Sequence, residues 1–170
     1  HILNAYTGVD SDAGFLQLNI TESGHFRSGG WSTTNRVSTD FFRDSGSWYH
    51  FVVNFDTTEG TAVDRMKVYV NNRLITDWGT NNAFTENTNY PINSASAHQI
   101  GRDNAISGGG QFAGYFADYY FIDGTIYAPS DFGETDEDTN QWKPKDASGL
   151  TFGTNGFLLK FEDSADLGND

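Results

Sequence analysis

The segment MKVYVNNRLIT, residues 66–76, decides the fold class that the sequence predicts. Every second residue from Met66 to Val70 is apolar, so these side chains share one face of an extended strand. Asn71 and Asn72 follow directly, and asparagine tolerates the positive φ angles that a two-residue hairpin turn requires. Residues 73–76 then resume an extended pattern. The segment is therefore predicted to form a β-hairpin.

Alternation of this kind recurs along the chain, whereas helical periodicity is nearly absent. We expect a polar surface connection with at most one short strand at residues 79–97, and a single helical turn at residues 129–132. Residues 112–122 are apolar on both faces, which predicts a central strand in a stacked pair of sheets. Many short strands separated by turns indicate an all-β, antiparallel sandwich. The other predicted strands span residues 16–20, 51–55, 98–102 and 157–161.

Length and charge limit the classes of protein and partner. The 170 residues fit a single domain spanning residues 1–170. The formal net charge is −13, and a surface of that sign repels phosphate backbones and anionic lipid, so nucleic acid is not an expected partner. No apolar run approaches the ~20 residues of a membrane helix, so membrane insertion is not expected either. The absence of cysteine excludes disulfides and thiolate metal sites.

Four segments follow one another in an informative order. Residues 47–53, SWYHFVV, contain the pattern Trp-x-His in a predicted strand. Residues 68–72, VYVNN, are similar to a hairpin of the pattern Tyr-Val-Asp-Gly. Residues 99–102, QIGR, and 112–118, FAGYFAD, match an Ile-Gly strand and the Phe-x-Gly strand after it. In this order the chain resembles the laminin-G-like branch of the concanavalin-A-like lectin/glucanase superfamily. The resemblance implies an antiparallel jelly-roll β-sandwich.

The C-terminal part sharpens the resemblance. Residues 132–136 (FGETD), 141–145 (QWKPK) and 153–157 (GTNGF) are similar to domains common in marine phage structural proteins, which implies a virion-surface setting. Such domains normally begin with an additional Trp-containing strand and continue beyond the DLGND of residues 166–170. The chain also opens on His1, without an initiator Met or a signal-peptide pattern. We therefore expect a domain truncated at both ends from a longer chain.

Catalysis is not expected from the distribution of carboxylates. Glucanases of this superfamily place acid and nucleophile on alternate strand positions, in a Glu-x-Asp-x-x-Glu pattern that aims both at one bond. No such pattern occurs here, and Asp118 is the single carboxylate of residues 112–122. Glu162 and Asp163 are sequence neighbours and would face opposite sides of a strand. His50 occupies the family's Trp-x-His position, where a structural role is expected.

The sequence also contains residues whose side-chain oxygens are candidate calcium ligands. Asp136, Asp138 and Asn140 have the spacing of the first half of a calcium loop. Gln141 then replaces the required glycine and no closing glutamate follows, so an EF-hand is excluded.

Two further pairs of residues with oxygen ligands lie in predicted loops and are candidates for a calcium site: Asp10 with Asp12, and Asp103 with Asn104. The alternative is that these residues cap turns, a common role for Asp and Asn.

Glycan binding needs an exposed aromatic platform beside groups that hydrogen-bond hydroxyls. Trp31 and Trp78 lie beside glycines in loop-like contexts, and Tyr90 is a third candidate ring. The alternative is that each of these tryptophans plugs the end of a sandwich. Trp48 and Trp142 are expected to be packing residues. The predicted ligand-binding residues are Trp31, Trp78, Tyr90, Asp103 and Asn104.

These expectations combine into one functional hypothesis and one alternative. The first is a non-enzymatic module on the virion surface of a phage, in a fibre, tail or capsid decoration. It would adhere to a glycan or attach to other virion proteins. The alternative is a secreted, extracellular microbial carbohydrate-binding or adhesin domain that uses calcium.

Overall fold

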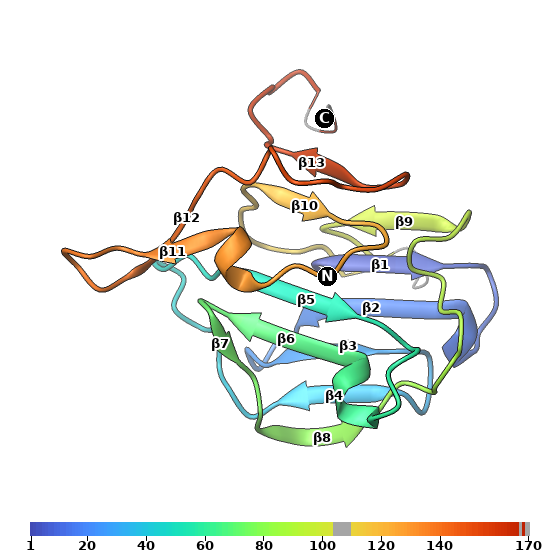
Figure 1. Cartoon of the computed structure of the whole chain (residues 1–170). Coiled ribbons are helices and arrows are strands. Elements are labelled where there is room, and N and C mark those ends of the chain that lie inside the picture. Colours follow the sequence, from blue (N-terminus) through green and yellow to red (C-terminus); the bar gives the residue numbers. More distant parts are fainter. Residues whose placement is uncertain (104–109, 167, 169–170) are drawn as a thin grey trace. The chain divides into compact units, whose positions relative to one another are not determined.

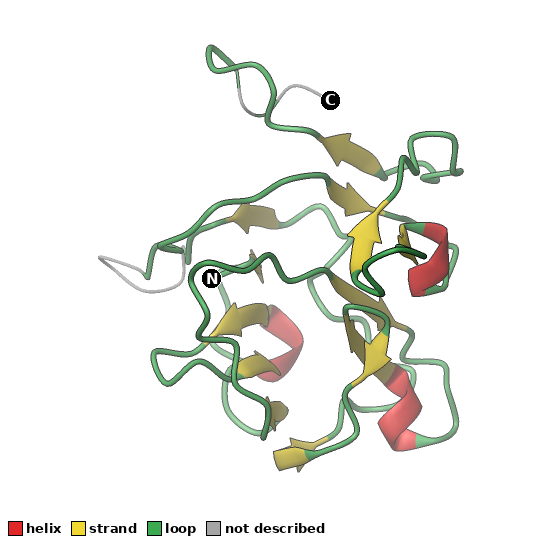
Figure 2. Ribbon diagram, turned by 90° about the vertical axis from the view of Figure 1, so that its left-hand side faces the viewer, coloured by secondary structure: helices red, strands yellow, loops and turns green. Residues whose placement is uncertain are grey.

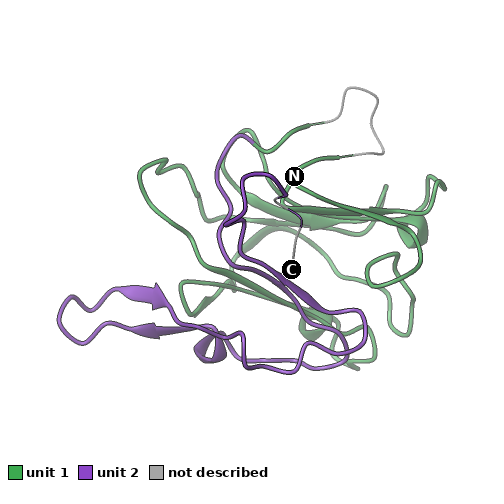
Figure 3. Cartoon of the chain, turned by 90° about the horizontal axis from the view of Figure 1, so that it is seen from above, with its two compact units in different colours: residues 1–112 green, residues 113–170 purple. Residues whose placement is uncertain are grey.

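The computed structural model describes residues 1–103, 110–166 and 168. They form thirteen β-strands and three short 3-10 helices, and every strand pair is antiparallel (Figures 1 and 2). The predicted all-β, antiparallel class is therefore confirmed. None of the helices in the described ranges is long and apolar enough to cross a membrane. The chain divides into two compact units, residues 1–112 and 113–170, coloured separately in Figure 3.

The larger sheet of the first unit has six strands. Alternation places Leu16 and Leu18 on one face of the central strand, and Gln17 and Asn19 on the other. Phe26 shares the apolar face, because it lies opposite Ile20 in the register. In spatial order the strands are β8 (Trp78–Asn82), β4 (Asn35–Ser38), β3 (Phe26–Gly29), β2 (Phe15–Ile20), β1 (Leu3–Tyr6) and β9 (Ala97–Ile100).

The smaller sheet of the same unit contains the hairpin that the sequence predicts. Its order is β5 (Phe51–Phe55), β6 (Met66–Val70) and β7 (Arg73–Leu74), and the helix η2 (Ala62–Arg65) precedes β6. Asn71 and Asn72 join β6 to β7 with φ angles of 48° and 67°. The predicted two-residue turn is confirmed, because both central residues have positive φ.

Both aromatic and charged side chains connect the two sheets of this unit. Phe26 of β3 stacks on Phe51 of β5 with ring centroids 5.7 Å apart. Arg36 of β4 donates from Nη1 to the carbonyl oxygen of Met66 at 2.5 Å. Burial lowers the pKa of Arg36, and backbone carbonyl oxygens offset part of the cost of enclosing its charge.

The second unit contains two separate two-stranded sheets. One pairs β10 (Tyr119–Phe121) with β13 (Phe157–Leu159), and the other pairs β11 (Gly133–Thr135) with β12 (Trp142–Pro144). The helix η3 (Pro129–Asp131) confirms the predicted helical turn, and the Asp131 carboxylate accepts the N–H of Ala128 at its start.

The long central strand predicted at residues 112–122 is wrong. Within the described part of the chain, only its C-terminal part, β10, forms a strand, and β10 pairs with β13 alone. Asp118 has a φ of 49°, and a left-handed residue interrupts an extended strand. Tyr115 lies outside any strand and is exposed. Hydrophobicity predicted the strand's position but not this break.

Candidate functional site

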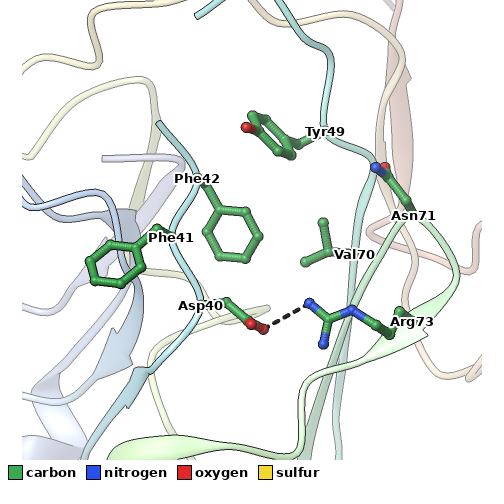
Figure 4. A pocket seen from close by; sticks show the side chains of 7 residues that line it. All are labelled: Asp40, Phe41, Phe42, Tyr49, Val70, Asn71 and Arg73. Carbon is green, nitrogen blue, oxygen red and sulfur yellow. Dashed lines mark hydrogen bonds and ion pairs between the residues drawn. The ribbon is translucent and has the colours of Figure 1, made fainter. Parts of the chain in front are cut away.

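An open hollow of about 380 Å³ lies in the first unit, between the connection 40–49 and the β6–β7 hairpin (Figure 4). It combines aromatic rings with polar side chains that have planar hydrogen-bonding groups. The residues that line it are Asp40, Phe41, Phe42, Tyr49, Val70, Asn71 and Arg73.

The connection 40–49 has no regular secondary structure, but hydrogen bonds fix its start to neighbouring turns. The N–H of Phe42 donates to the carbonyl oxygen of Gly24 at 2.7 Å, and Arg43 Nε donates to that of Ser23 at 2.7 Å. Gly24 has a φ of 85°, and a Cβ there would lie 2.5 Å from Arg43 Cγ. Glycine is therefore required where this connection approaches the preceding turn.

A tight turn fixes the middle of the connection. The carboxylate of Asp44 accepts hydrogen bonds from the hydroxyl of Ser47 and the N–H of Gly46, which lower the pKa of Asp44. The N–H of Asp44 donates to the hydroxyl oxygen of Tyr49 at 3.1 Å. The Tyr49 ring is thus held by the turn that precedes it.

Three rings and one aliphatic side chain form the apolar part of the hollow. Phe42 packs edge-on against Tyr49 and Phe51, with ring centroids 5.5 and 5.2 Å apart. Figure 4 shows the Phe42 ring turned towards Val70, which is buried, while Phe41 projects away from them. These contacts hold Phe42 and Tyr49 in place before any ligand arrives.

The polar edge of the hollow lies on the hairpin. Arg73 Nη2 donates to Asp40 Oδ2 at 2.8 Å, and the guanidinium is mostly exposed. Among the described residues, the Nε and Nη1 of Arg73 have no acceptor. The side-chain oxygen of Asn71 accepts the N–H of His50, which joins the hairpin to the connection 40–49.

This arrangement places apolar rings beside planar hydrogen-bonding groups. Aromatic rings offer apolar faces to the C–H groups of a sugar ring, and planar polar groups bind neighbouring hydroxyls with defined geometry. Asp40 supplies acceptors, while Arg73 and the side-chain amide of Asn71 supply donors.

Comparison with models of protein families, with curated proteins and with solved structures gives no match.

Trp31, the first ring predicted from the sequence, lies in the turn between β3 and β4, away from the hollow. It is 40% exposed and lies parallel to Tyr6, with centroids 6.3 Å apart and 13° between the planes. Phe15 contacts Trp31 edge-on at 5.5 Å. Tyr6 and Phe15 thus pack against the Trp31 ring and leave part of its surface accessible. Trp31 is not among the residues that line the hollow.

Trp78 lies at the opposite end of β4 from Trp31. It pairs with Ser38, the last residue of β4, whereas Trp31 precedes Asn35, the first. The guanidinium of Arg36 lies 4.0 Å from the centroid of the Trp78 ring, a cation–π contact. The structure therefore does not bring the two tryptophans into one platform.

Tyr90, the third predicted ring, belongs to the core of the first unit. It is 6% exposed and packs edge-on against Phe84 and Phe55, at 5.0 and 5.7 Å. Its hydroxyl oxygen accepts the N–H of Thr85 at 3.0 Å. This ring offers little surface to a ligand.

Asp103 is not among the residues that line the hollow. Asp103 is 1% exposed and lies beside Asn4, while Asn104 falls outside the described residues. Trp48, expected to be a packing residue, is instead 67% exposed, so that prediction is wrong. Trp142 packs as expected, against Gly133, where a Cβ would lie 2.5 Å from its ring.

The carboxylates considered for calcium are mostly used in turns. Asp136 accepts hydrogen bonds from the N–H and hydroxyl of Thr139 and from Lys143, and its pKa is strongly lowered by these contacts. Asp10 accepts the hydroxyl of Tyr6, and Asp12 accepts backbone N–H groups of the Trp31 turn. Over the described ranges, no three His, Asp or Glu side chains come together as a metal site.

A second hollow, of about 390 Å³, lies in the second unit beside β13. Its Phe157 ring is already stacked on Tyr119 and Phe121, with centroids 6.3 and 5.3 Å apart. A ring stacked on both neighbours offers little free face, so this hollow is the weaker candidate.

The hollow is not among the sites predicted from the sequence, although the sequence contains a signal for it. Four aromatic residues, at positions 41, 42, 48 and 49, surround the polar segment RDSGS. Rings concentrated around a Gly- and Ser-containing turn are the pattern that could have indicated it.

Proposed function

We propose that the chain is a non-enzymatic glycan-binding module whose site is the hollow between the connection 40–49 and the β6–β7 hairpin. The observation that carries this proposal is the position of Phe42 and Tyr49 beside the Asp40–Arg73 ion pair. Apolar and hydrogen-bonding groups lie within one hollow, as recognition of a sugar requires. The fold proposed for the module is the laminin-G-like jelly-roll sandwich.

The residues of the hollow favour binding over hydrolysis. Glycosidases of the common type need two carboxylates that flank the scissile bond. Asp40 is the only carboxylate among the residues that line the hollow, and it forms an ion pair with Arg73. An acid and a nucleophile are therefore not both supplied.

The proposed setting is the virion surface of a phage, in a fibre, tail or capsid decoration. Support for it comes from the resemblance of residues 132–157 to marine phage structural domains. Adhesion to a host or environmental glycan would be the role, with other virion proteins as attachment partners. The alternative setting is a secreted microbial adhesin that uses calcium.

A glycan array probed with the purified chain, with and without a chelator, tests the proposal. We expect binding to a defined set of glycans. Loss of that binding on chelation favours the calcium-dependent adhesin. Failure to bind any glycan, together with ordered packing of the chain in a virion map, would contradict the proposal and favour simple attachment.

Substitutions then locate the site. We expect Arg73→Ala to weaken binding by about ten-fold or more, since hydrogen bonds to charged groups contribute about 1.5–3 kcal/mol. Arg102→Ala, which removes an exposed arginine outside the hollow, should leave the affinity unchanged. If Trp31→Ala or Trp78→Ala abolishes binding and Arg73→Ala does not, the site lies at one of those tryptophans instead.

A further inference from the structure

The chain contains one Asn-Gly pair, at residues 155–156, and one Asp-Gly pair, at residues 123–124. The structure places the two pairs against each other in the second unit. The N–H of Asn155 donates to Asp123 Oδ2 at 3.2 Å, and the N–H of Asp123 donates to the carbonyl oxygen of Phe152 at 2.7 Å. Asn155 therefore lies beside a carboxylate, in the connection that leads into β13.

The surroundings of Gly156 require glycine at this position. A Cβ there would overlap the carbonyl oxygen of Phe152, which accepts the N–H of Asp123. Any larger residue would displace this backbone. The same absence of a side chain leaves the Gly156 nitrogen unhindered, so the fold itself keeps an unhindered nitrogen directly after Asn155.

The Gly156 nitrogen is also available to react with the side chain of Asn155. Asn155 is exposed and lies in a bend, outside the strands. The N–H of Gly156 has no hydrogen-bond acceptor in the described part of the chain, so no such bond must break first. The nitrogen and the side-chain carbonyl carbon belong to adjacent residues, and this proximity strongly favours closure of a succinimide ring.

We propose that Asn155 is a site of spontaneous deamidation. The Gly156 nitrogen loses its proton and bonds to Asn155 Cγ, the bond from Cγ to Nδ2 breaks, and ammonia leaves with that proton. Water then opens the succinimide at either carbonyl, which gives aspartate or isoaspartate at position 155. The net reaction consumes one water, releases one ammonia and converts a neutral amide into a carboxylate. This proposal is independent of the glycan site.

The product alters the charge and the backbone where β13 begins. A new carboxylate beside Asp123 is repelled by it, in a chain whose net charge is already −13. Isoaspartate also adds one carbon atom to the backbone, which displaces Phe157 from its register with Phe121 and from their ring stack at 5.3 Å. We therefore expect deamidation to weaken the pairing of β10 with β13 as the protein ages.

Prolonged incubation of the 170-residue chain at mildly alkaline pH, followed by peptide mass spectrometry, tests the proposal. The peptide that contains residue 155 should gain the mass difference between a hydroxyl and an amino group, with isoaspartate among its products. It should do so faster than any peptide that contains another asparagine, and the rate should rise with pH because the attacking nitrogen must lose its proton.

A synthetic peptide of residues 152–158 gives the rate without the fold. The folded chain should react within about ten-fold of this peptide, since the structure leaves the nitrogen accessible. A folded chain that reacts more slowly than this, or modification spread evenly over the asparagines, would overturn the proposal.

Two variants connect the reaction to its effect on stability. Asn155→Gln should prevent the modification, because its longer side chain must close a larger ring, and the incubated variant should keep its Tm. Freshly purified Asn155→Asp reproduces the new charge without the additional backbone atom, so its Tm should lie between those of the fresh and the fully deamidated chain. An equal loss of Tm in incubated Asn155→Gln would overturn the effect assigned to residue 155.

Discussion

Asp12, in the short helix η1 (Asp12–Gly14), fixes the turn that carries Trp31. Its carboxylate accepts hydrogen bonds from the backbone N–H groups of Ser32, Thr33 and Thr34. Burial alone would raise the pKa of Asp12, but these bonds and the Thr33 hydroxyl outweigh burial and lower the pKa to about 2. One side chain thus satisfies three consecutive N–H groups of the turn.

The lowered pKa of Asp12 predicts a pH-dependent contribution to stability. Because the folded pKa lies below the ordinary value, the contribution is complete above about pH 4 and is lost as the pH falls towards 2. Allowing for solvent screening, Asp12→Asn should lower the free energy of unfolding by about 1 kcal/mol at pH 7 and by much less near pH 2.

Urea unfolding at several pH values measures this difference. Asp10→Asn is the control, since Asp10 accepts only the Tyr6 hydroxyl among the described residues. Equal unfolding free energies for Asp12→Asn and the unsubstituted chain at pH 7 would contradict the account of this turn.

At the scale of elements, the β6–β7 turn positions Arg73 at the hollow. Asn72 has a φ of 67°, which glycine adopts freely and β-branched residues strongly resist. Asn72→Gly should therefore leave the free energy of unfolding nearly unchanged, whereas Asn72→Val should lower it by about 1–2 kcal/mol. Denaturant titration of both variants checks the pair, and an Asn72→Val chain as stable as Asn72→Gly would refute the assigned turn.

The elements that could be predicted from sequence are those with clear alternation. β2, β5, β6 and the hairpin follow from residues that alternate in polarity. β3 and β4 could not be predicted, because FRSG and NRVS are short and polar and become strands only through their neighbours. At Asp118 the apolar pattern predicts a strand where the structure has none, because such a pattern does not indicate that a residue adopts a left-handed conformation.

The sequence around residues 43–47 signals an aromatic cluster, but the orientation of the rings in the hollow could not be predicted, for a related reason. The rings of Phe42 and Tyr49 are oriented by a hydrogen bond to Gly24 and by the turn at Asp44, not by strand alternation. The first of these contacts joins residues 18 positions apart and the second joins residues five apart, and neither leaves a periodic pattern. The prediction that Trp48 packs is wrong for a similar reason, because aromaticity alone does not distinguish a core ring from an exposed one.

At the scale of the whole molecule, residues 1–170 are predicted to be one domain, and the chain contains two compact units. A single domain should unfold in one cooperative transition. Trp142 is the only tryptophan of the second unit. In a variant with phenylalanine at positions 31, 48 and 78, Trp142 is the only tryptophan left, so tryptophan fluorescence follows the unfolding of the second unit. Its midpoint should coincide with the midpoint followed by circular dichroism, and two separate transitions would show two domains.

The most direct test of the glycan site is a nuclear magnetic resonance titration of the ¹⁵N-labelled chain with a glycan that binds on the array. The hollow predicts that the largest amide shifts fall in residues 40–49 and 70–73, with saturation and with loss of the shifts in Arg73→Ala. Shifts confined to the Trp31 turn, or no saturable shifts with any glycan, would contradict it.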